Sequence, residues 1–354
     1  MPRWLALLVL FVPSQLLAQD WESLRDSLAK RVEAGDPGFA VLVLERGQTV
    51  FAASHGMADL EAGRAITGET PFYIASLGKT LTALAIMQLA EAGKLQLDQR
   101  ISSFVPELPS WLAPVRIDRA LTHTSGMPDY PEELAGETSC LDNDDVIEWL
   151  KAPREPPSGG KKTVYSNAAY VLLAEVVEVA SGLSYPDYLH QRIFEPAAMR
   201  TARVVRSPAE RPAEAAIGYR RGEEGWAVDD YQQCTLGPGG LYASVADLAA
   251  FDRALREGRL LGPEAMSRLY TPATLADGSS TAFSPGWISG EIRAGELVGL
   301  EVRQAFGNLA GFHAALRRFV NPAVTIIWLS NRGEALFDAG IETAAIEAGL
   351  LPTR

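Results

Sequence analysis

The chain has 354 residues, of which 47% are hydrophobic and 21% charged, and this is the composition of a globular protein with a sizeable core. Its formal net charge is −12, and no basic cluster interrupts the excess of acidic groups. Because a surface of this sign repels nucleic-acid backbones and anionic membranes, we expect neither as a partner.

The first eighteen residues have the layout of a secretory signal peptide. Residues 1–3 give a short positive start, residues 4–12 are apolar, and Ala18 precedes the polar pair Gln19-Asp20. We expect cleavage after Ala18 and export to the periplasm or the medium, with no integral membrane span in the mature chain. The alternative is an uncleaved anchor, but the apolar run is short for a bilayer.

The elements expected next in chain order are a helix, a hairpin and a buried helix. Residues 21–34 have helical periodicity, and residues 39–44 and 49–54 are β-prone runs around a turn at Arg46-Gly47. Residues 76–92 are apolar on nearly every side, which indicates a helix buried all round.

The middle of the chain reads as helical and the end as strands. Helices are expected at 142–151, 168–180 and 248–255, with caps at Ser184 and Ser244. Four strands follow at 286–292, 297–306, 313–320 and 323–330, and then a closing helix at 335–348.

This order predicts an α/β (α+β) fold in which one antiparallel sheet is built from both chain ends. Helices flank the sheet, and a mostly helical lobe is inserted between its two halves. We assign the sheet lobe to about 21–66 plus 284–354 and the helical lobe to about 67–283, within one domain spanning 19–354. Cys140 and Cys234 form a disulfide or remain two buried thiols; the sequence leaves both open.

Ser76 and Lys79 form a Ser-x-x-Lys pattern at the start of the buried helix. Residues three apart share one helix face, so the Lys79 ammonium should lie near the Ser76 hydroxyl. Desolvation lowers the pKa of a buried lysine, which suits it to take the serine proton. The other interpretation, a helix cap followed by a solvated lysine, fits poorly with so apolar a helix.

Tyr165-Ser166-Asn167 lies where a loop passes into the next helix. The Tyr165 hydroxyl is suited to relay protons, and Asn167 to bind a substrate amide or the lysine. The plainer interpretation is that Tyr165 packs and Asn167 caps the helix. Neither pattern is specific by itself.

Four stretches taken together resemble class C β-lactamases and the related penicillin-binding DD-peptidases and esterases. The resemblance covers about 38–331, in the family's order and spacing. Its stretches are residues 72–79 (FYIASLGK), 121–128 (LTHTSGMP), 165–170 (YSNAAY) and 239–244 (GGLYAS).

The resemblance implies a cleft between the lobes, with Ser76 acylated, Lys79 and Tyr165 moving protons, and Asn167 binding substrate. It implies no metal and no cofactor, and a structural part for His123 rather than a catalytic one. Gly307 would let substrate lie against a strand. The backbone N–H groups of Ser76 and Asn308 would be the two donors to the oxyanion.

One position departs from the family pattern. Ala305 stands where a lysine or histidine normally precedes Gly307 by two residues, and His313 does not replace it. Loss of a charged hydrogen bond costs on the order of 1.5–3 kcal/mol, which argues against efficient β-lactam or peptidoglycan hydrolysis. Arg303, on the same strand face, either supplies the missing charge or is an ordinary exposed arginine.

The leading hypothesis is therefore an exported serine hydrolase that cleaves an ester, amide or β-lactam bond of a small molecule or peptide. The alternative is a penicillin-binding or peptidoglycan-binding protein disabled by Ala305, with little or no turnover. An α/β-hydrolase would need a Gly-x-Ser-x-Gly elbow, which we do not find. The substrate and the oligomeric state are not predicted.

Overall fold

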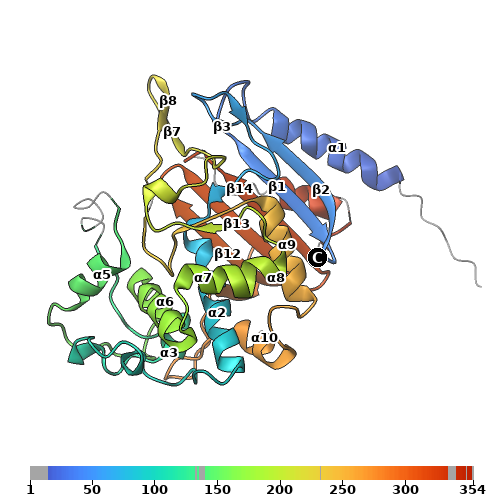
Figure 1. Ribbon diagram of the computed structural model, residues 1–354. Helices are drawn as coiled ribbons and strands as arrows, with labels where there is room; N and C mark the ends of the chain where they lie inside the picture. The colour runs from blue at the N-terminus through green and yellow to red at the C-terminus, as the bar shows by residue number, and fades with distance from the viewer. Residues whose placement is uncertain are drawn as a thin grey trace, which may run out of the picture.

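A seven-stranded antiparallel sheet joins the two ends of the chain (Figure 1). The computed structural model describes residues 15–131, 134, 140–231, 233–333, 340–347 and 349–352. The N-terminal hairpin pairs with the last C-terminal strand, with Phe39 opposite Ser330. In spatial order the strands are β10 (Phe283–Ser284), β11 (Trp287–Glu291), β12 (Glu301–Leu309), β13 (Phe312–Phe319), β14 (Val324–Ser330), β1 (Phe39–Glu45) and β2 (Gln48–His55).

Both faces of the sheet are buried, and the alternation along β1 shows it. Phe39, Val41 and Val43 belong to one apolar cluster, whereas Ala40 and Leu44 belong to the other. Successive side chains on a strand point to opposite faces, so a strand buried on both sides loses its polar alternation. The first cluster is covered by α1 (Gln15–Ala29) and α11 (Gly340–Glu347), and the second by α9 (Val245–Arg256) and the helical part.

The helices of the middle of the chain gather on the α9 side of the sheet (Figure 1). At their centre lies α2 (Lys79–Glu91), whose residues are buried on nearly all sides. Around it are α3 (Ile117–Leu121), α5 (Asn143–Leu150), α6 (Asn167–Ser181), α7 (Tyr185–Leu189), a π-turn (His190–Phe194), α8 (Glu195–Ala197) and α10 (Pro263–Leu269).

Short strands complete the fold between these helices. One small sheet has the order β5 (Phe72–Tyr73), β9 (Leu241–Ala243) and β6 (Arg203–Val204). Two hairpins are formed by β3 (Met57–Asp59) with β4 (Arg64–Ala65) and by β7 (Tyr219–Gly222) with β8 (Gly225–Val228). The β5–β9–β6 sheet helps to position the site, because β5 leads directly into the turn that carries Ser76.

The sequence-based expectations hold for the architecture and shift at several boundaries. The antiparallel sheet from both chain ends, flanked by helices, is confirmed. The caps expected at Ser184 and Ser244 are present, and the structure adds a capping box at Asp142 that was not expected. The strand expected at 297–306 instead spans Glu301–Leu309, because residues 297–300 turn back onto Ile292.

Two expectations fall largely outside the described residues. The leader at 1–18 is described only from Gln15, in α1, and the start of the closing helix precedes Gly340. Among the described helices, none alone is long and apolar enough to cross a membrane. One bent pair, Asn167–Ser181 with Tyr185–Ala197, passes by length and composition only.

Candidate active site

Ser76 lies in a short 3-10 turn that precedes the buried helix. The turn spans Ala75–Gly78, and α2 begins at Lys79, so the single helix expected from Ser76 onward is wrong in this detail. Side chains three apart eclipse in a 3-10 turn, which stacks Lys79 over Ser76. Ala75 has a φ of 45°, in the left-handed region, a strained conformation that often marks functional sites.

The Lys79 ammonium uses all three of its N–H groups inside the protein. It donates to Ser76 Oγ at 2.9 Å, to Asn167 Oδ1 at 2.7 Å and to the carbonyl of Pro238 at 3.1 Å. Lys79 is 3% exposed. The buried lysine expected from the apolar helix is therefore present, and it is fixed against the serine.

Tyr165 is the second side chain that contacts Ser76 Oγ. Its hydroxyl donates to Ser76 Oγ at 3.0 Å, and the Lys79 ammonium lies 5.0 Å from the centre of its ring. Tyr165 is also 42% exposed, so its phenol is open to solvent and to a bound molecule. Ser76 Oγ thus lies between two groups that can exchange protons with it.

Asn167 is held by a residue that sequence reasoning did not single out. Asp129 Oδ2 accepts from the Asn167 side-chain N–H at 2.8 Å, and its Oδ1 accepts the backbone N–H groups of Asn167 and Ala168 at 2.8 and 3.0 Å. These contacts anchor the start of α6 and turn the Asn167 oxygen toward Lys79. Burial raises the pKa of Asp129, although the two backbone hydrogen bonds and Lys79 oppose the shift.

His123 supports Tyr165, and in the described part of the chain its side chain hydrogen-bonds Ser166 rather than Ser76 or Lys79. Its ring packs on the Tyr165 ring with centres 4.3 Å apart, and its Nδ1 accepts the Ser166 N–H at 3.3 Å. Burial, together with the charge of Lys79, lowers the pKa of His123 to about 3. The imidazole is therefore neutral at physiological pH, which suits the structural part expected for it.

A cavity of about 660 Å³ opens beside Ser76. Among the described residues that line it there is one carboxylate and no lysine or arginine. Its walls are Tyr73, Ala75, Ser76, Asp129, Tyr130, Asn167, Tyr231, Gln233, Pro238, Gly239, Asn308 and Leu309.

Strand β12 packs against the turn that carries Ser76, and Gly307 makes this close approach possible. A Cβ on Gly307 would lie 2.0 Å from the Ile74 carbonyl oxygen, so only glycine lets the strand approach the Ser76 turn. Asn308 follows at the cavity wall, and its side-chain oxygen lies 2.7 Å from His313 Nδ1. His313 Nε2 lies 2.7 Å from the Gly333 carbonyl, so His313 orients Asn308 and lies outside the Ser76 cluster.

Arg303 does not supply the positive charge that a lysine or protonated histidine would bring at position 305. The guanidinium of Arg303 lies 4.0 Å from the centre of the Tyr270 ring and 3.5 Å from Glu301, and Arg303 is absent from the residues that line the space near Ser76. The hypothesis of a compensating charge is therefore wrong for this conformation. Stacking on Tyr270 gives the arginine a nearer partner than the cleft does.

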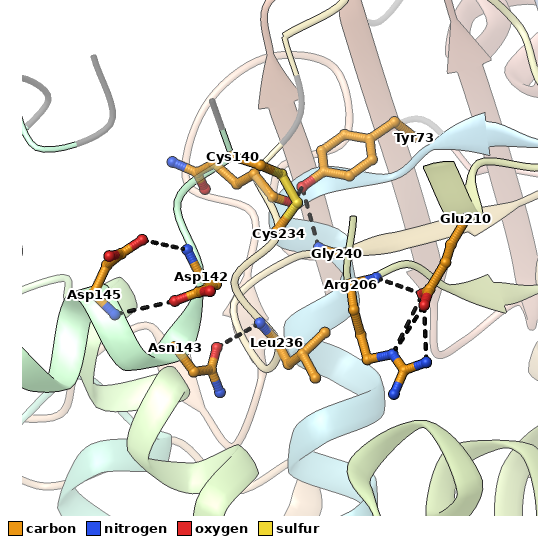
Figure 2. The surroundings of a disulfide bond; sticks show 11 residues. Tyr73, Cys140, Asp142, Asn143, Asp145, Arg206, Glu210, Cys234, Leu236 and Gly240 are labelled. Atoms are coloured by element: carbon orange, nitrogen blue, oxygen red, sulfur yellow. Dashed lines mark hydrogen bonds and ion pairs between the residues drawn. A yellow bond between two sulfur atoms is a disulfide. The ribbon is translucent and has the colours of Figure 1, made fainter. Parts of the chain in front are cut away.

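The two cysteines form one disulfide, so the alternative of two free thiols is wrong (Figure 2). Cys140 and Cys234, with Cα atoms 5.5 Å apart, join two loops that flank the cavity. Beside the bond, the Tyr73 hydroxyl donates to the Gln233 carbonyl at 3.2 Å and accepts the Gly240 N–H at 3.1 Å. The disulfide therefore lies next to Gln233, which lines the cavity.

Three aromatic residues of the second half of the chain differ in their relation to the cavity. Tyr231 lines the cavity, whereas Tyr242 is fully buried against Tyr73. Trp226 lies on the β7–β8 hairpin, where the Arg221 and Arg332 guanidinium groups pack on its ring.

Comparison with known proteins places this chain in a family. The family model described as Beta-lactamase matches residues 16–350. The chain belongs to the beta-lactamase family. Proteins of this family are generally serine hydrolases, and the resemblance stated from the four motifs is confirmed.

Relatives of this beta-lactamase-family protein have several names. It is 30% identical over 330 residues to penicillin-binding protein 4* of Bacillus subtilis, covering 87% of this chain and 70% of that protein. It is 26% identical to a D-aminopeptidase of Brucella ovis, covering 90% of this chain but only 61% of that longer protein. The crystal structure of a penicillin-binding protein from Bacillus halodurans superposes with a TM-score of 0.76 at 25% identity, covering 95% and 99% of the two chains.

Proposed function

We propose that the protein is an exported serine hydrolase that cleaves an ester or amide bond through an acyl-enzyme on Ser76. The observation that carries the proposal is the position of Ser76 Oγ, 2.9 Å from Lys79 Nζ and 3.0 Å from the Tyr165 hydroxyl. A serine hydroxyl needs a neighbour that takes its proton, and either Lys79 as a free amine or Tyr165 as a phenolate would be that neighbour.

The reaction would proceed in two steps. In the reactive form either Lys79 or Tyr165 has lost its proton. Ser76 Oγ attacks the substrate carbonyl carbon, and its proton passes to that group and then to the leaving group as the scissile bond breaks. A water molecule then attacks the acyl-enzyme, gives its proton to the same group, and restores the Ser76 hydroxyl while the acid is released. The backbone N–H groups of Ser76 and Asn308 are the proposed donors to the oxyanion.

The charges around the site favour substrates without an anionic group. The described lining of the large cavity contains Asp129 but no cation, and Ala305 adds none on the strand. Lys79 already donates three hydrogen bonds within the protein. We therefore place neutral or amine-bearing acyl groups, as in the substrates of an aminopeptidase, ahead of penicillins and carboxylate-ended peptides.

Export is the second part of the proposal. It is supported by the signal-like residues 1–18 and by the disulfide between Cys140 and Cys234, since disulfides persist mainly in oxidising compartments. A binding protein without turnover is the weaker candidate, because Ser76, Lys79, Tyr165 and Asn167 keep a connected hydrogen-bond arrangement.

The test is intact-mass measurement after incubation with p-nitrophenyl acetate and, separately, with a penicillin. We expect an acetyl increment on the wild type that Ser76→Ala lacks, and at least a hundredfold loss of ester turnover in that variant, in the range known for nucleophile removal. Ser181→Ala, at the far end of α6, is the matched control and should behave as the wild type. An acetyl increment that persists in Ser76→Ala would refute the assignment of the nucleophile.

A further inference from the structure

The register of the sheet places a buried tryptophan opposite the alanine that departs from the family pattern. Strands β11 and β12 are antiparallel, with Ile288 opposite Gln304 and Ser289 opposite Arg303. Extending this register by one residue beyond the Ile288–Gln304 pair places Trp287 opposite Ala305. Directly opposed residues share a sheet face, with Cβ atoms about 4.5–5.5 Å apart.

Both side chains face the catalytic residues across a narrow slot. The slot has a volume of about 50 Å³ and lies beside Ser76, Lys79 and Tyr165. It is distinct in position from the large cavity, because Ser76 is the one described residue that lines both. Its remaining walls are His123, Phe283, Ser284, Gly286, Trp287, Ile288, Gln304, Ala305 and Phe306.

The tryptophan ring is fixed in place. Trp287 is 2% exposed, and its ring meets the Tyr270 ring edge to face with centres 5.5 Å apart. The Tyr270 hydroxyl in turn accepts from Arg318 at 2.8 Å. A long side chain at position 305 would have to share the sheet face that the indole already occupies, so Ala305 and Trp287 act as a small–large pair.

The indole also has an unused donor. Among the described residues, Trp287 Nε1 is buried without a hydrogen-bond partner. Buried polar groups without a partner are uncommon in folded proteins, and at a site they indicate a ligand or a water. The indole adds neither a charge nor a strong acceptor to the slot, so the wall formed by Trp287 is neutral.

We propose that Trp287 and Ala305 form the leaving-group subsite and select compact, uncharged leaving groups such as a small alcohol or amine. This inference rests on the proposed function, because it needs an acyl-enzyme at Ser76. The two spaces that meet at Ser76 then divide the substrate: the large cavity takes the acyl part and the slot takes the part that departs.

The experiment compares methyl butyrate, benzyl butyrate and the butyryl ester of glycolic acid by titration of the released acid. All three pass through the same butyryl-enzyme, so differences in kcat/KM report only the leaving group. Relative to their rates of alkaline hydrolysis, the wild type should prefer the methyl ester to the other two.

Two variants change the slot in opposite directions. Trp287→Leu should raise the benzyl-to-methyl ratio of kcat/KM about tenfold or more, because it widens the slot, whereas Ala305→Val should lower it by a similar factor. Ala305→Val keeps the test available if Trp287→Leu does not fold. The matched control is Trp328→Leu, which removes a tryptophan that is also buried with an unpaired Nε1 but packs on Phe39 in the cluster on the opposite face of the sheet.

The inference is overturned if the wild type prefers the glycolate ester, or if both slot variants keep the wild-type ratio while the butyryl adduct still forms on Ser76. It is also overturned if Trp328→Leu changes the ratio as much as Trp287→Leu does. Absence of any Ser76 adduct in the wild type would refute the proposed function itself, so the two failures are distinguishable.

Discussion

At the scale of single residues, the site is a chain of hydrogen bonds that begins outside the catalytic pair. Asp129 holds the Asn167 amide, the Asn167 oxygen holds Lys79, and Lys79 holds Ser76. The orientation of an amide depends on its partners, because its two ends have opposite hydrogen-bonding character. Asp129 is thus a positioning residue that decides which end of Asn167 faces the lysine.

Asp129→Asn should lower kcat through this chain while changing KM little. The new amide would place an N–H group against the Asn167 N–H, which favours reversal of the Asn167 amide and loss of its bond to Lys79. A lost hydrogen bond to a charged group corresponds to roughly a tenfold to hundredfold loss in kcat/KM. Steady-state kinetics on p-nitrophenyl acetate measures it.

The control for this variant is Asp277→Asn. Asp277 is an exposed carboxylate that accepts from the Ser279 hydroxyl and backbone N–H in a distant loop. It should leave both kinetic constants unchanged. Wild-type kcat in Asp129→Asn would show that Asp129 does not act through Asn167.

At the scale of elements, three segments from different parts of the chain converge on one point. The 3-10 turn Ala75–Gly78 presents Ser76, α6 presents Asn167, and β12 brings Gly307 against the Ile74 carbonyl. Tyr130 and Tyr231 form part of the cavity wall, and Cys140 and Cys234, which follow them in the chain, are joined by the disulfide (Figure 2). The acyl part of the substrate would contact this wall.

Replacing both cysteines by alanine should destabilise the protein and loosen substrate binding. The bond closes a loop across 94 positions in sequence, and removal of a disulfide typically lowers the free energy of unfolding by about 2–4 kcal/mol. We expect KM to rise more than kcat falls, because Ser76, Lys79 and Tyr165 lie on other segments. Urea unfolding and steady-state kinetics measure the two effects.

Reduction of the wild type with dithiothreitol should reproduce the kinetic change, and the double variant should not respond to the reductant. A lower stability with an unchanged KM would mean that the disulfide stabilises the fold without shaping the cavity.

At the scale of the whole molecule, one buried asparagine ties together segments that are distant in sequence. Asn331, which is fully buried, accepts the Gly38 N–H at 2.8 Å and donates to the Met57 carbonyl at 3.0 Å and the Ile217 carbonyl at 2.8 Å. These bonds join the end of β14 to the start of β1, to β3 and to the middle of the chain. The two chain ends are thereby held to the rest of the fold.

Asn331→Ala should lower the free energy of unfolding by roughly 2–4 kcal/mol, because it leaves one buried donor and two buried carbonyls without their partner. Denaturant unfolding followed by tryptophan fluorescence measures it. Asn143→Ala is the comparison, since Asn143 makes two side-chain hydrogen bonds but is only partly buried. A loss below about 1 kcal/mol for Asn331→Ala would contradict this role.

The sequence alone determined the features that depend on local chemistry and on periodicity within one element. The apolar run after Ser76 predicted a buried helix, the spacing of Ser76 and Lys79 predicted their contact, and the strand patterns at both ends predicted the sheet. Four short motifs together predicted the family. These inferences depend on residues that are close in sequence or on a pattern that repeats within one element.

Only the tertiary structure decided which distant residues meet. Asp129 is 38 positions from Asn167, and its loop gave no signal that its carboxylate would anchor α6. The pairing of Cys140 with Cys234, the stacking of Arg303 on Tyr270, and the position of Trp287 opposite Ala305 follow from loop paths and strand register. A shift of register by one residue would turn Trp287 to the other face of the sheet, and the local sequence does not fix that register by itself.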